Sequence, residues 1–534
     1  MTDLPFPLFD AACIVGRHLK LQANGLHSAA DLLADLDHYG IAEALVVDSL
    51  SREGHPEPGN QRVLEVVRDN PRLVPAWSAL PAYGDDEQEA PEAFLTRMRE
   101  HRVGALFFYP RQYRFSLQDW CVDPFLGPFA EARVPLFIDY NEVGRGGWGW
   151  DHTDWEAVVG LCRRWPQLPV VVSEFRIRQA QRMIYRALDA CPNLHLELSG
   201  LWLHRAIEYI TDHWGADRLI FGSYWPYLGH HVTVAPLATA EIDEADRTRI
   251  AAGNLRRLVS WCGPRPEVKV ELPPPADEFA AFARTGIRPP EMRFWDNHGH
   301  MGGRATHYHL PNCTLDGIVR DMDRLGVQQT CVFSFTGVFS DEQPGNDYVA
   351  EAVRRYPDRF VGFTLVNPHR GRDGMLRELE RGAAMGLRGV KLIPHYQDYP
   401  EEGPLIDVAC QWAHERRQII LDHHWGSAAQ VERLVSTYAD ACFFTGHSTT
   451  AYVEVMQRHP NLYVCSCPLC GPRTCEEVVA AIGADRLMFG SDLQDLPIAW
   501  GLGPILFARL EPAQKRLILG ENLRRVLRQY SLNP

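Results

Sequence analysis

Short apolar runs alternate with amphipathic segments along the second half of the chain. Runs of four to six apolar residues predict parallel strands that are buried on both faces, and segments of helical periodicity lie between them. The expected strands are 293–297, 330–335, 360–366, 389–393, 419–421, 441–445, 462–465 and 487–490, and the expected helices include 314–325, 348–356 and 375–385. Eight strands that alternate with helices favour an α/β fold with a closed (β/α)8 TIM barrel.

The first half of the chain repeats sequence words of the second half in the same order. Gly-Ala-Asp-Arg-Leu at 215–219 and Asn-Leu-Arg-Arg at 254–257 recur at 483–487 and 522–525, which is 268 positions later in both cases. Farther upstream, Asp10 and Pro-Gly-Asn at 58–60 recur at Asp296 and 344–346, 286 positions later. Such ordered agreement indicates a tandem duplication, and therefore two tandem TIM barrels.

A proline-rich segment separates the two copies. Residues 262–292 contain Pro264, Pro266, the run Pro-Pro-Pro at 273–275 and Pro-Pro at 289–290. Proline fixes φ and removes a hydrogen-bond donor, so the segment is expected to be a semi-rigid linker with one short helix over 277–284. The expected domains are a first barrel at 1–261, this linker at 262–292, and a second barrel at 293–534.

Composition narrows the class of protein. The chain has 534 residues, of which 46% are hydrophobic and 23% charged, as in ordinary globular proteins. Its formal net charge of −14, without a Lys/Arg cluster, argues against nucleic acid and anionic membranes as partners. No signal peptide and no run of 18 apolar residues is found. Thirteen scattered cysteines do not suggest a disulfide framework, so reduced thiols and a cytoplasmic location are expected.

Polar residues gather where the strands of the second barrel end, which is where the active sites of TIM barrels lie. The strand ends carry Asp-Asn-His-Gly-His at 296–300, Lys391, Asp-His-His at 422–424, His447 and Asp492. A single histidine at a strand end is usually a hydrogen-bonded core residue. Five such strand ends in one barrel indicate a functional site.

The first of these strand ends predicts a metal site. His298 and His300 are two residues apart on a strand, so their imidazoles point to the same side. A third imidazole from strand five and a carboxylate from strand eight would complete a set of three nitrogens and one oxygen. That set suits Zn²⁺ or another borderline divalent ion.

The order of these residues resembles the amidohydrolase superfamily. The ending Phe-Gly-Ser-Asp at 489–492 and the strand Gly-Val-Lys-Leu-Ile-Pro at 389–394 are similar to the branch that contains aminocarboxymuconate-semialdehyde decarboxylase and related hydrolases, lactonases and hydratases. The resemblance covers 6–261 and 293–530. It implies one divalent metal ion, with Zn²⁺ as first choice and Mn²⁺ as second. The metal ligands that it implies are His298, His300, His423 and Asp492.

The resemblance also implies catalytic roles. Asp492 would act as general base on a metal-activated water. His447 would touch the substrate or that water, and it would polarise the carbonyl under attack or stabilise the oxyanion. His424 competes with His423 as the ligand from strand five, and His423 is preferred. Lys391 would either bridge two metals as a carboxylated lysine or lie near the substrate, and a single metal is favoured. The substrate-binding candidates are Lys391, His424, Arg304 and Gln397.

Two further clusters carry less weight. Cys465, Cys467, Cys470 and Cys475 could hold a structural zinc ion, although the first copy has an ordinary strand and loop at the same place. The pair His230-His231 has no partner motif and is expected at the surface.

The first copy lacks the chemical residues. The repeat offsets place Ala12 and Ile14 where the second copy has His298 and His300, and they place Leu106, Tyr140 and Tyr224 opposite Lys391, His423 and Asp492. The first barrel is therefore expected to hold no such metal site. It could act as a degenerate partner domain in an intramolecular barrel–barrel pseudo-dimer, or bind a ligand of its own.

The expected function is a metal-dependent hydrolase of a small polar or carboxylated molecule with an amide, ester or lactone bond. The same site could instead decarboxylate or hydrate an unsaturated or aromatic carboxylic acid, and a non-catalytic scaffold is the third alternative. The expected partner is a small-molecule substrate, and a homo-oligomer is compatible with the sequence.

Overall fold

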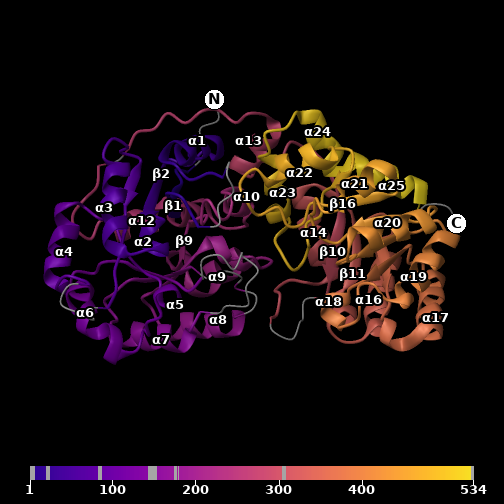
Figure 1. Cartoon of the computed structure of the whole chain (residues 1–534), viewed down its shortest axis with the longest axis horizontal. Coiled ribbons are helices and arrows are strands. Elements are labelled where there is room, and N and C mark those ends of the chain that lie inside the picture. Colours follow the sequence, from indigo (N-terminus) through magenta and orange to yellow (C-terminus); the bar gives the residue numbers. More distant parts are fainter. Residues whose placement is uncertain are drawn as a thin grey trace. The chain divides into compact units, whose positions relative to one another are not determined.

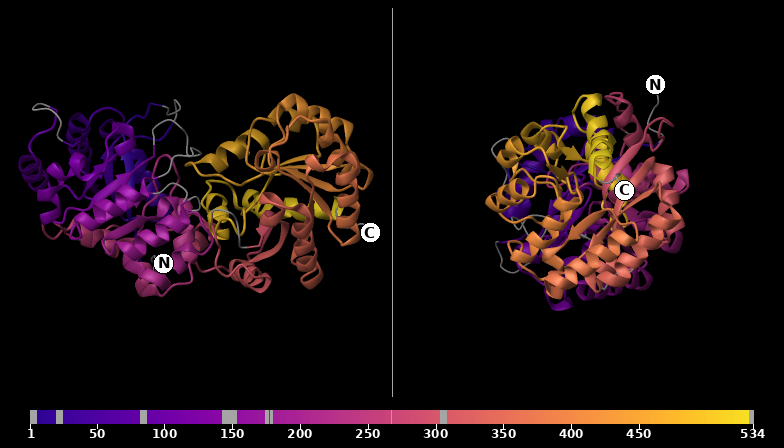
Figure 2. Two further views of the ribbon diagram at one scale, coloured as in Figure 1. Left: turned by 90° about the horizontal axis from the view of Figure 1, so that it is seen from below. Right: turned by 90° about the vertical axis from the view of Figure 1, so that its right-hand side faces the viewer.

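The computed structural model describes residues 6–19, 25–81, 87–141, 153–173, 177, 180–266, 268–302 and 308–530. The chain forms two compact units, Met1–Gly286 and Ile287–Pro534. In each unit the helices lie outside the strands (Figures 1 and 2). Within the described ranges, no helix has the length and apolar character that crossing a bilayer requires.

The second unit is an eight-stranded parallel barrel whose strands follow one another in chain order. Its strands are β10 (Phe294–Met301), β11 (Val327–Ser334), β12 (Phe360–Leu365), β13 (Gly389–Leu392), β14 (Ile419–Asp422), β15 (Cys442–Thr445), β16 (Leu462–Cys465) and β17 (Leu487–Met488). The segment after β17 returns to β10, where the Asn297 amide donates to the Phe489 carbonyl (2.9 Å) and the Asp492 amide donates to the His298 carbonyl (2.9 Å). These bonds close the barrel, and the predicted fold class is confirmed.

Helices follow the strands of this unit. They are α14 (Leu315–Leu325), α15 (Phe335–Phe339), α16 (Glu342–Arg355), α17 (Gly371–Ala384), α18 (Pro394–Gln397), α19 (Pro404–Glu415), α20 (Ala428–Thr437), α21 (Val453–Arg458), α22 (Thr474–Ile482), α23 (Ile498–Leu506), α24 (Pro512–Arg516) and α25 (Asn522–Tyr530). Local sequence sets their ends. In α14 the Thr314 side chain accepts a hydrogen bond from the Gly317 amide, and Gly326 ends the helix with a φ of 83°.

The first unit has the same order of strands and helices. Its strands are β1 (Phe9–Val15), β2 (Glu43–Asp48), β3 (Leu73–Pro75), β4 (Trp77–Ser78), β5 (Leu106–Phe108), β6 (Leu136–Asp139), β7 (Val170–Ser173), β8 (Leu194–Glu197) and β9 (Leu219–Ile220). They form sheets β1–β3 and β4–β9. β3 and β4 together take the place of one strand, which is interrupted after Pro75. β1 bonds to the segment after β9, where the Ala11 amide donates to the Phe221 carbonyl (3.0 Å).

The first unit includes most of the predicted linker, one part of which is helical. The helices of this unit are α1 (Ala29–Tyr39), α2 (Leu50–Glu53), α3 (Pro56–Val67), α4 (Pro91–Glu100), α5 (Pro110–Tyr113), α6 (Asp119–Glu131), α7 (Trp155–Arg164), α8 (Gln181–Ala190), α9 (Ala206–Trp214), α10 (His231–Thr239), α11 (Glu244–Thr248), α12 (Asn254–Val259) and α13 (Glu278–Thr285). The predicted short helix is α13. It packs on α10, and the buried Arg284 donates to the Asp37 carbonyl (2.8 Å). The segment up to Gly286 thus belongs to the first unit instead of standing apart from it.

The repeated sequence words make the same contacts in both units. The Asn254 amide group donates to the carbonyls of Ala216 and Leu219 (2.9 Å each), and that of Asn522 donates to the carbonyls of Ala484 and Leu487 (2.8 Å each). In both cases the asparagine ties the last strand to the helix that follows it. These matching contacts support the proposed duplication.

The expectation that His230-His231 lies at the surface is wrong. His230 is fully buried and its Nδ1 lies 3.0 Å from Asp10 Oδ2, while the His231 side chain is 3% exposed. Every residue of α10 is buried, so this helix has no solvent-facing side. A histidine paired with a buried carboxylate is hidden from sequence reasoning because its partner is 220 positions away along the chain.

Candidate metal centre

Two segments present the predicted ligands at the mouth of the second barrel. His298 and His300 lie near the end of β10, and Asp492 follows β17 with a left-handed φ of 57°. Asp296 braces both segments. Its Oδ1 accepts from the amides of His298 and Ser491 (3.0 Å each), and its Oδ2 accepts from the Ser491 hydroxyl (2.6 Å). The sequence analysis noted Asp296 as a repeated position and as part of a polar strand end but assigned it no role, and in the structure it supports the candidate ligands.

His298, His300 and Asp492 converge. Asp492 Oδ1 lies 2.9 Å from His300 Nε2 and 3.5 Å from His298 Nε2. One ligand atom from each of the three residues lies within 4.8 Å of the others, and all three residues are buried. Two imidazoles and a carboxylate at this separation fit a single divalent ion of the zinc type.

His423 and His447 lie beside this group without being part of it. Their Nε2 atoms face each other at 3.2 Å, and His447 Nδ1 lies 3.3 Å from the Cys467 carbonyl oxygen. If His447 donates from Nδ1 to that carbonyl, its Nε2 lone pair points at His423, so a proton or a shared cation would stabilise the pair. The role of His423 as fourth ligand and that of His447 in catalysis remain predictions.

The electrostatics of the site favour the protonation states that bind metal. Burial lowers the pKa of His298 and of His423 well below the usual value, so both imidazoles are neutral. Burial by itself would raise the pKa of Asp492. The hydrogen bond and the charge interaction with His300 outweigh burial and hold that pKa well below its usual value. Neutral imidazoles and an ionised carboxylate are the forms that coordinate a cation.

Lys391 is buried inside the same barrel. Its Nζ lies 4.5 Å from the centre of the Phe333 ring, and among the described residues it has no hydrogen-bond partner. Burial lowers the pKa of Lys391 and raises that of the nearby Asp422. A buried amine without a hydrogen bond is costly, which is consistent with a role at the site and leaves both predicted roles open.

The remaining substrate-binding candidates are His424, Gln397 and Arg304. The His424 side chain is 60% exposed and lies 3.2 Å from Glu401, so it points away from His423. The Gln397 side chain donates to the Gly337 carbonyl (2.9 Å) and ties α18 to α15. Arg304 lies outside the described residues. Of the four clustered cysteines, Cys465, Cys467 and Cys475 are buried, and Cys465 Sγ lies 4.0 Å from His298 Nδ1.

The mouth of the first barrel differs at the ligand positions. The Asp10 carboxylate accepts from the amides of Ala12 (2.9 Å) and Ser223 (3.1 Å), as Asp296 does from His298 and Ser491. Ala12 therefore corresponds to His298. Tyr224 has a φ of 63° and corresponds to Asp492. These two positions agree with the repeat offsets.

Two other correspondences shift by one residue. Lys391 pairs with Leu421 in the ladder of the second barrel, and the matching interior pair in the first barrel is Phe107 with Phe137. Phe107, and not Leu106, therefore corresponds to Lys391. By the same shift Asp139, and not Tyr140, corresponds to His423. Side chains along a strand alternate between its two sides, so an offset that is wrong by one selects the outward side chain.

A buried arginine occupies the mouth of the first barrel. Arg52 on α2 is 1% exposed, and its Nη2 donates to the Tyr224 hydroxyl (2.6 Å) and to the Asn141 carbonyl (2.8 Å). Asp139 Oδ2 accepts from that hydroxyl (2.7 Å) and lies 3.6 Å from the guanidinium. A fixed positive charge beside a carboxylate thus stands where the second barrel gathers its metal ligands.

The buried Glu197 predicts that the stability of the first unit depends on pH. It is 2% exposed, and burial raises its pKa from 4.5 to about 8 despite hydrogen bonds from Ser199. Between these pH values the protein takes up one proton when it folds. The stability that Glu197 contributes is therefore fully present below pH 4.5 and is lost as the pH rises through 8. The loss is at most about 1.4 kcal/mol per pH unit. Glu197→Gln should flatten the fall in the urea midpoint of the first unit, followed by hydrogen exchange of that unit, between about pH 5 and 7.5. The control is Glu131→Gln on an exposed side chain, and equal falls in both variants would contradict the assignment.

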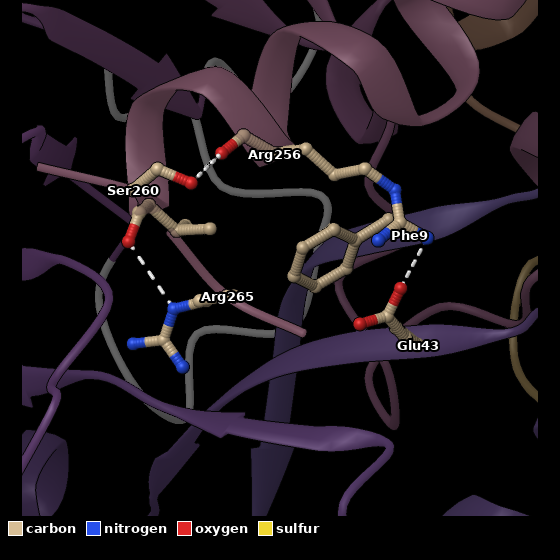
Figure 3. Close-up of a pocket in the computed structure, with 6 residues that line it drawn as sticks. Phe9, Glu43, Arg256, Ser260 and Arg265 are labelled. Carbon is tan, nitrogen blue, oxygen red and sulfur yellow. Dashed lines mark hydrogen bonds and ion pairs between the residues drawn. The ribbon is translucent and has the colours of Figure 1, made fainter. Parts of the chain in front are cut away.

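A separate cavity of about 260 Å³ lies in the first unit (Figure 3). It is at the end of the strands opposite the mouth, because Phe9 and Glu43 begin β1 and β2. Arg256 forms an ion pair with Glu43, and Arg265 donates to the Val259 carbonyl (3.2 Å). The charge of Arg256 is thus balanced by Glu43, and the Arg265 side chain is held by a backbone carbonyl. In TIM barrels this end serves stability.

Known proteins resemble both units. The family model described as Amidohydrolase matches residues 24–261 and 335–529. The second match contains His423, His447 and Asp492 and begins after β10. An L-fucono-1,5-lactonase from Burkholderia ambifaria is 27% identical over 217 residues, which is 37% of this chain and 69% of that protein.

Solved structures match one barrel at low identity. An uncharacterised TIM-barrel protein from Bordetella bronchiseptica has a TM-score of 0.38 at 16% identity and covers 45% of this chain and 99% of its own. A 2,6-dihydroxybenzoate decarboxylase from Rhizobium has a TM-score of 0.36 at 16% identity and covers 44% of this chain and 98% of its own. The family model matches well over half of the sequence. The chain therefore belongs to the amidohydrolase family and is a metal-dependent hydrolase or a related lyase.

Proposed function

We propose that the second barrel hydrolyses a small polar or carboxylated substrate at an amide, ester or lactone bond. The observation that carries the proposal is the convergence of His298, His300 and Asp492 at the carboxyl ends of the strands. We further propose Zn²⁺ as the ion, held by these three residues and by His423, because imidazole and carboxylate ligands suit it. A bound divalent ion would lower the pKa of water to about 7 and polarise a carbonyl group.

The side chains of this site can move the required proton. Asp492 is ionised in its buried position, so it can accept a proton from the attacking water and later return it to the leaving group. His447 Nδ1 lies 3.3 Å from the Cys467 carbonyl oxygen, which orients the ring, and its Nε2 lies 3.2 Å from Nε2 of His423, the proposed fourth ligand. From there it can stabilise the oxygen that becomes negative during attack.

The curated relative supports hydrolysis over decarboxylation. It is a lactonase, and opening a lactone ring needs only an activated water and a proton acceptor. Decarboxylation or hydration of an unsaturated or aromatic acid is the second candidate, since the same residues could hold a carboxylate against the ion.

Removing the metal tests the proposal. The purified protein should contain about one divalent ion per chain, and dialysis against a chelator should abolish turnover, because the water at the site then keeps its ordinary pKa. Adding Zn²⁺ or Mn²⁺ should restore turnover. The assay would measure acid release from sugar lactones such as L-fucono-1,5-lactone and carbon dioxide release from aromatic acids.

The two products separate the candidates. Acid release without carbon dioxide supports hydrolysis, whereas carbon dioxide release supports the second candidate. Turnover that survives complete removal of the metal would refute both.

A further inference from the structure

A row of aromatic rings runs along one side of the mouth of the second barrel. Phe335 and Phe339 come from α15, and Tyr396 comes from α18. The Phe335 ring is stacked on the His300 imidazole, with centroids 4.7 Å apart and planes within 8°. At the other end, the Tyr396 ring meets the His423 imidazole edge to face at 5.4 Å. The row therefore connects two of the predicted metal ligands.

The rings are in contact along the whole row. Phe335 and Phe339 are stacked with centroids 6.0 Å apart, and Phe339 meets Tyr396 edge to face at 5.3 Å. Such pairs hold one another in fixed orientations. Since α15 follows β11 and α18 follows β13, the row is built from loops at the carboxyl ends of the strands, the same end as the ligands.

Exposure rises along the row. Phe335 is 2% exposed, Phe339 is partly buried, and Tyr396 is 41% exposed. An exposed aromatic ring does not by itself indicate a binding site, because the Trp120 ring in the first unit is also exposed (73%). Tyr396 differs because its ring touches a histidine of the site. Its open surface is thus next to the place where a substrate must enter.

Polar side chains also contact His423, and one of them, His395, lies against the aromatic row with its ring centroid 5.3 Å from that of Tyr396. His447 Nε2 is 3.2 Å from His423 Nε2, and the His395 ring lies parallel to that of His423 at 6.1 Å. His423 thus contacts both His447 and Tyr396, so a substrate whose reacting carbonyl or carboxylate faces His447 and Asp492 has the Tyr396 ring, and Phe339 next to it, within reach. Flat groups with π electrons pack best on such rings.

We propose that Tyr396 and Phe339 determine substrate specificity by packing against a flat, unsaturated group attached to the reacting carbon. The inference rests on the proposed function of the second barrel and adds the shape of the substrate to it. It assigns Phe335 a different task, which is to hold the His300 ring in place.

The test compares two probes of equal charge and similar size, benzoate and cyclohexanecarboxylate, which differ in flatness. Titration calorimetry with the metal-loaded protein should show benzoate binding about 3- to 10-fold more tightly, as one or two aromatic contacts predict. Tyr396→Ala should abolish this preference, and Phe339→Leu should reduce it. Tyr396→Phe keeps the ring and should preserve it, as should the control Trp120→Ala on an exposed ring of the first unit.

The outcomes distinguish this inference from the proposed function. Equal binding of the two probes, absence of benzoate binding, or an unchanged preference in Tyr396→Ala would each overturn the role of the aromatic row. Metal content is measured on every variant. A protein that holds its metal and loses turnover on chelation, yet shows no preference for benzoate, would keep the proposed function and refute the inference.

Discussion

Asp492→Asn and His298→Ala are expected to lose the bound divalent ion and to lower turnover by on the order of 10³-fold or more. Asp492→Asn would keep the shape of the side chain and remove the negative charge that faces His298 and His300. His298→Ala would remove one of the three converging donors. Elemental analysis of the purified variants measures the first effect, and steady-state turnover measures the second.

The matched control is His414→Ala in the same barrel. His414 lies on α19 and pairs with Asp440 at 3.8 Å, away from the three ligands. This variant should keep both metal and turnover. If Asp492→Asn binds a full equivalent of metal and turns over at the normal rate, the assigned site is not the catalytic one.

Replacing Arg52 with methionine should destabilise the first unit by about 3 kcal/mol. The change leaves the buried Asp139 without its cation. Breaking a buried ion pair costs about 3 to 5 kcal/mol. The loss expected here is near the lower end of that range, because the Tyr224 hydroxyl (2.7 Å) and the Asn141 amide (2.8 Å) still donate to the Asp139 carboxylate. Denaturation followed by hydrogen exchange reports each unit separately, which a single unfolding curve of a two-unit chain does not.

A second variant makes the interpretation specific. Arg52→Met with Asp139→Asn removes the unpaired charge, so it should be more stable than Arg52→Met alone. Arg186→Ala, at a pair on the surface whose arginine side chain is 85% exposed, should have no measurable effect. Equal stability of the single and double variants would show that Arg52 does not balance Asp139.

The arginine also bears on the role of the first barrel. With Ala12 and Tyr224 in the ligand positions and Arg52 beside Asp139, the described residues of that mouth offer no converging donors of the kind found in the second barrel. We propose that the chain carries one metal ion, in its second barrel. Two equivalents of metal per chain would argue against this assignment.

Much of the second barrel could be predicted from the sequence. The apolar runs and their helical spacers are local patterns, and local patterns place strands to within a few residues, as β16 at Leu462–Cys465 shows. His298 and His300 share a strand, so their common direction also follows from local geometry. Placing Asp492 beside them required one more rule, which is that the carboxyl ends of parallel strands meet at one face of a barrel.

Other features could be decided only by tertiary structure. The burial of His230 depends on Asp10, and the mouth of the first barrel depends on Arg52 meeting Asp139 and Tyr224. These partners are far apart along the chain, so no local sequence pattern predicts that they are paired. The correspondence of Lys391 to Phe107 needed the strand register, because a gap of one residue reverses which side chain faces inward. The sequence by itself predicted the strands of the second barrel to within a few residues, the repeated words and the candidate ligands, since each depends on neighbouring residues or simple spacing. Only the folded chain decided which distant charges are paired, because that depends on contacts in space.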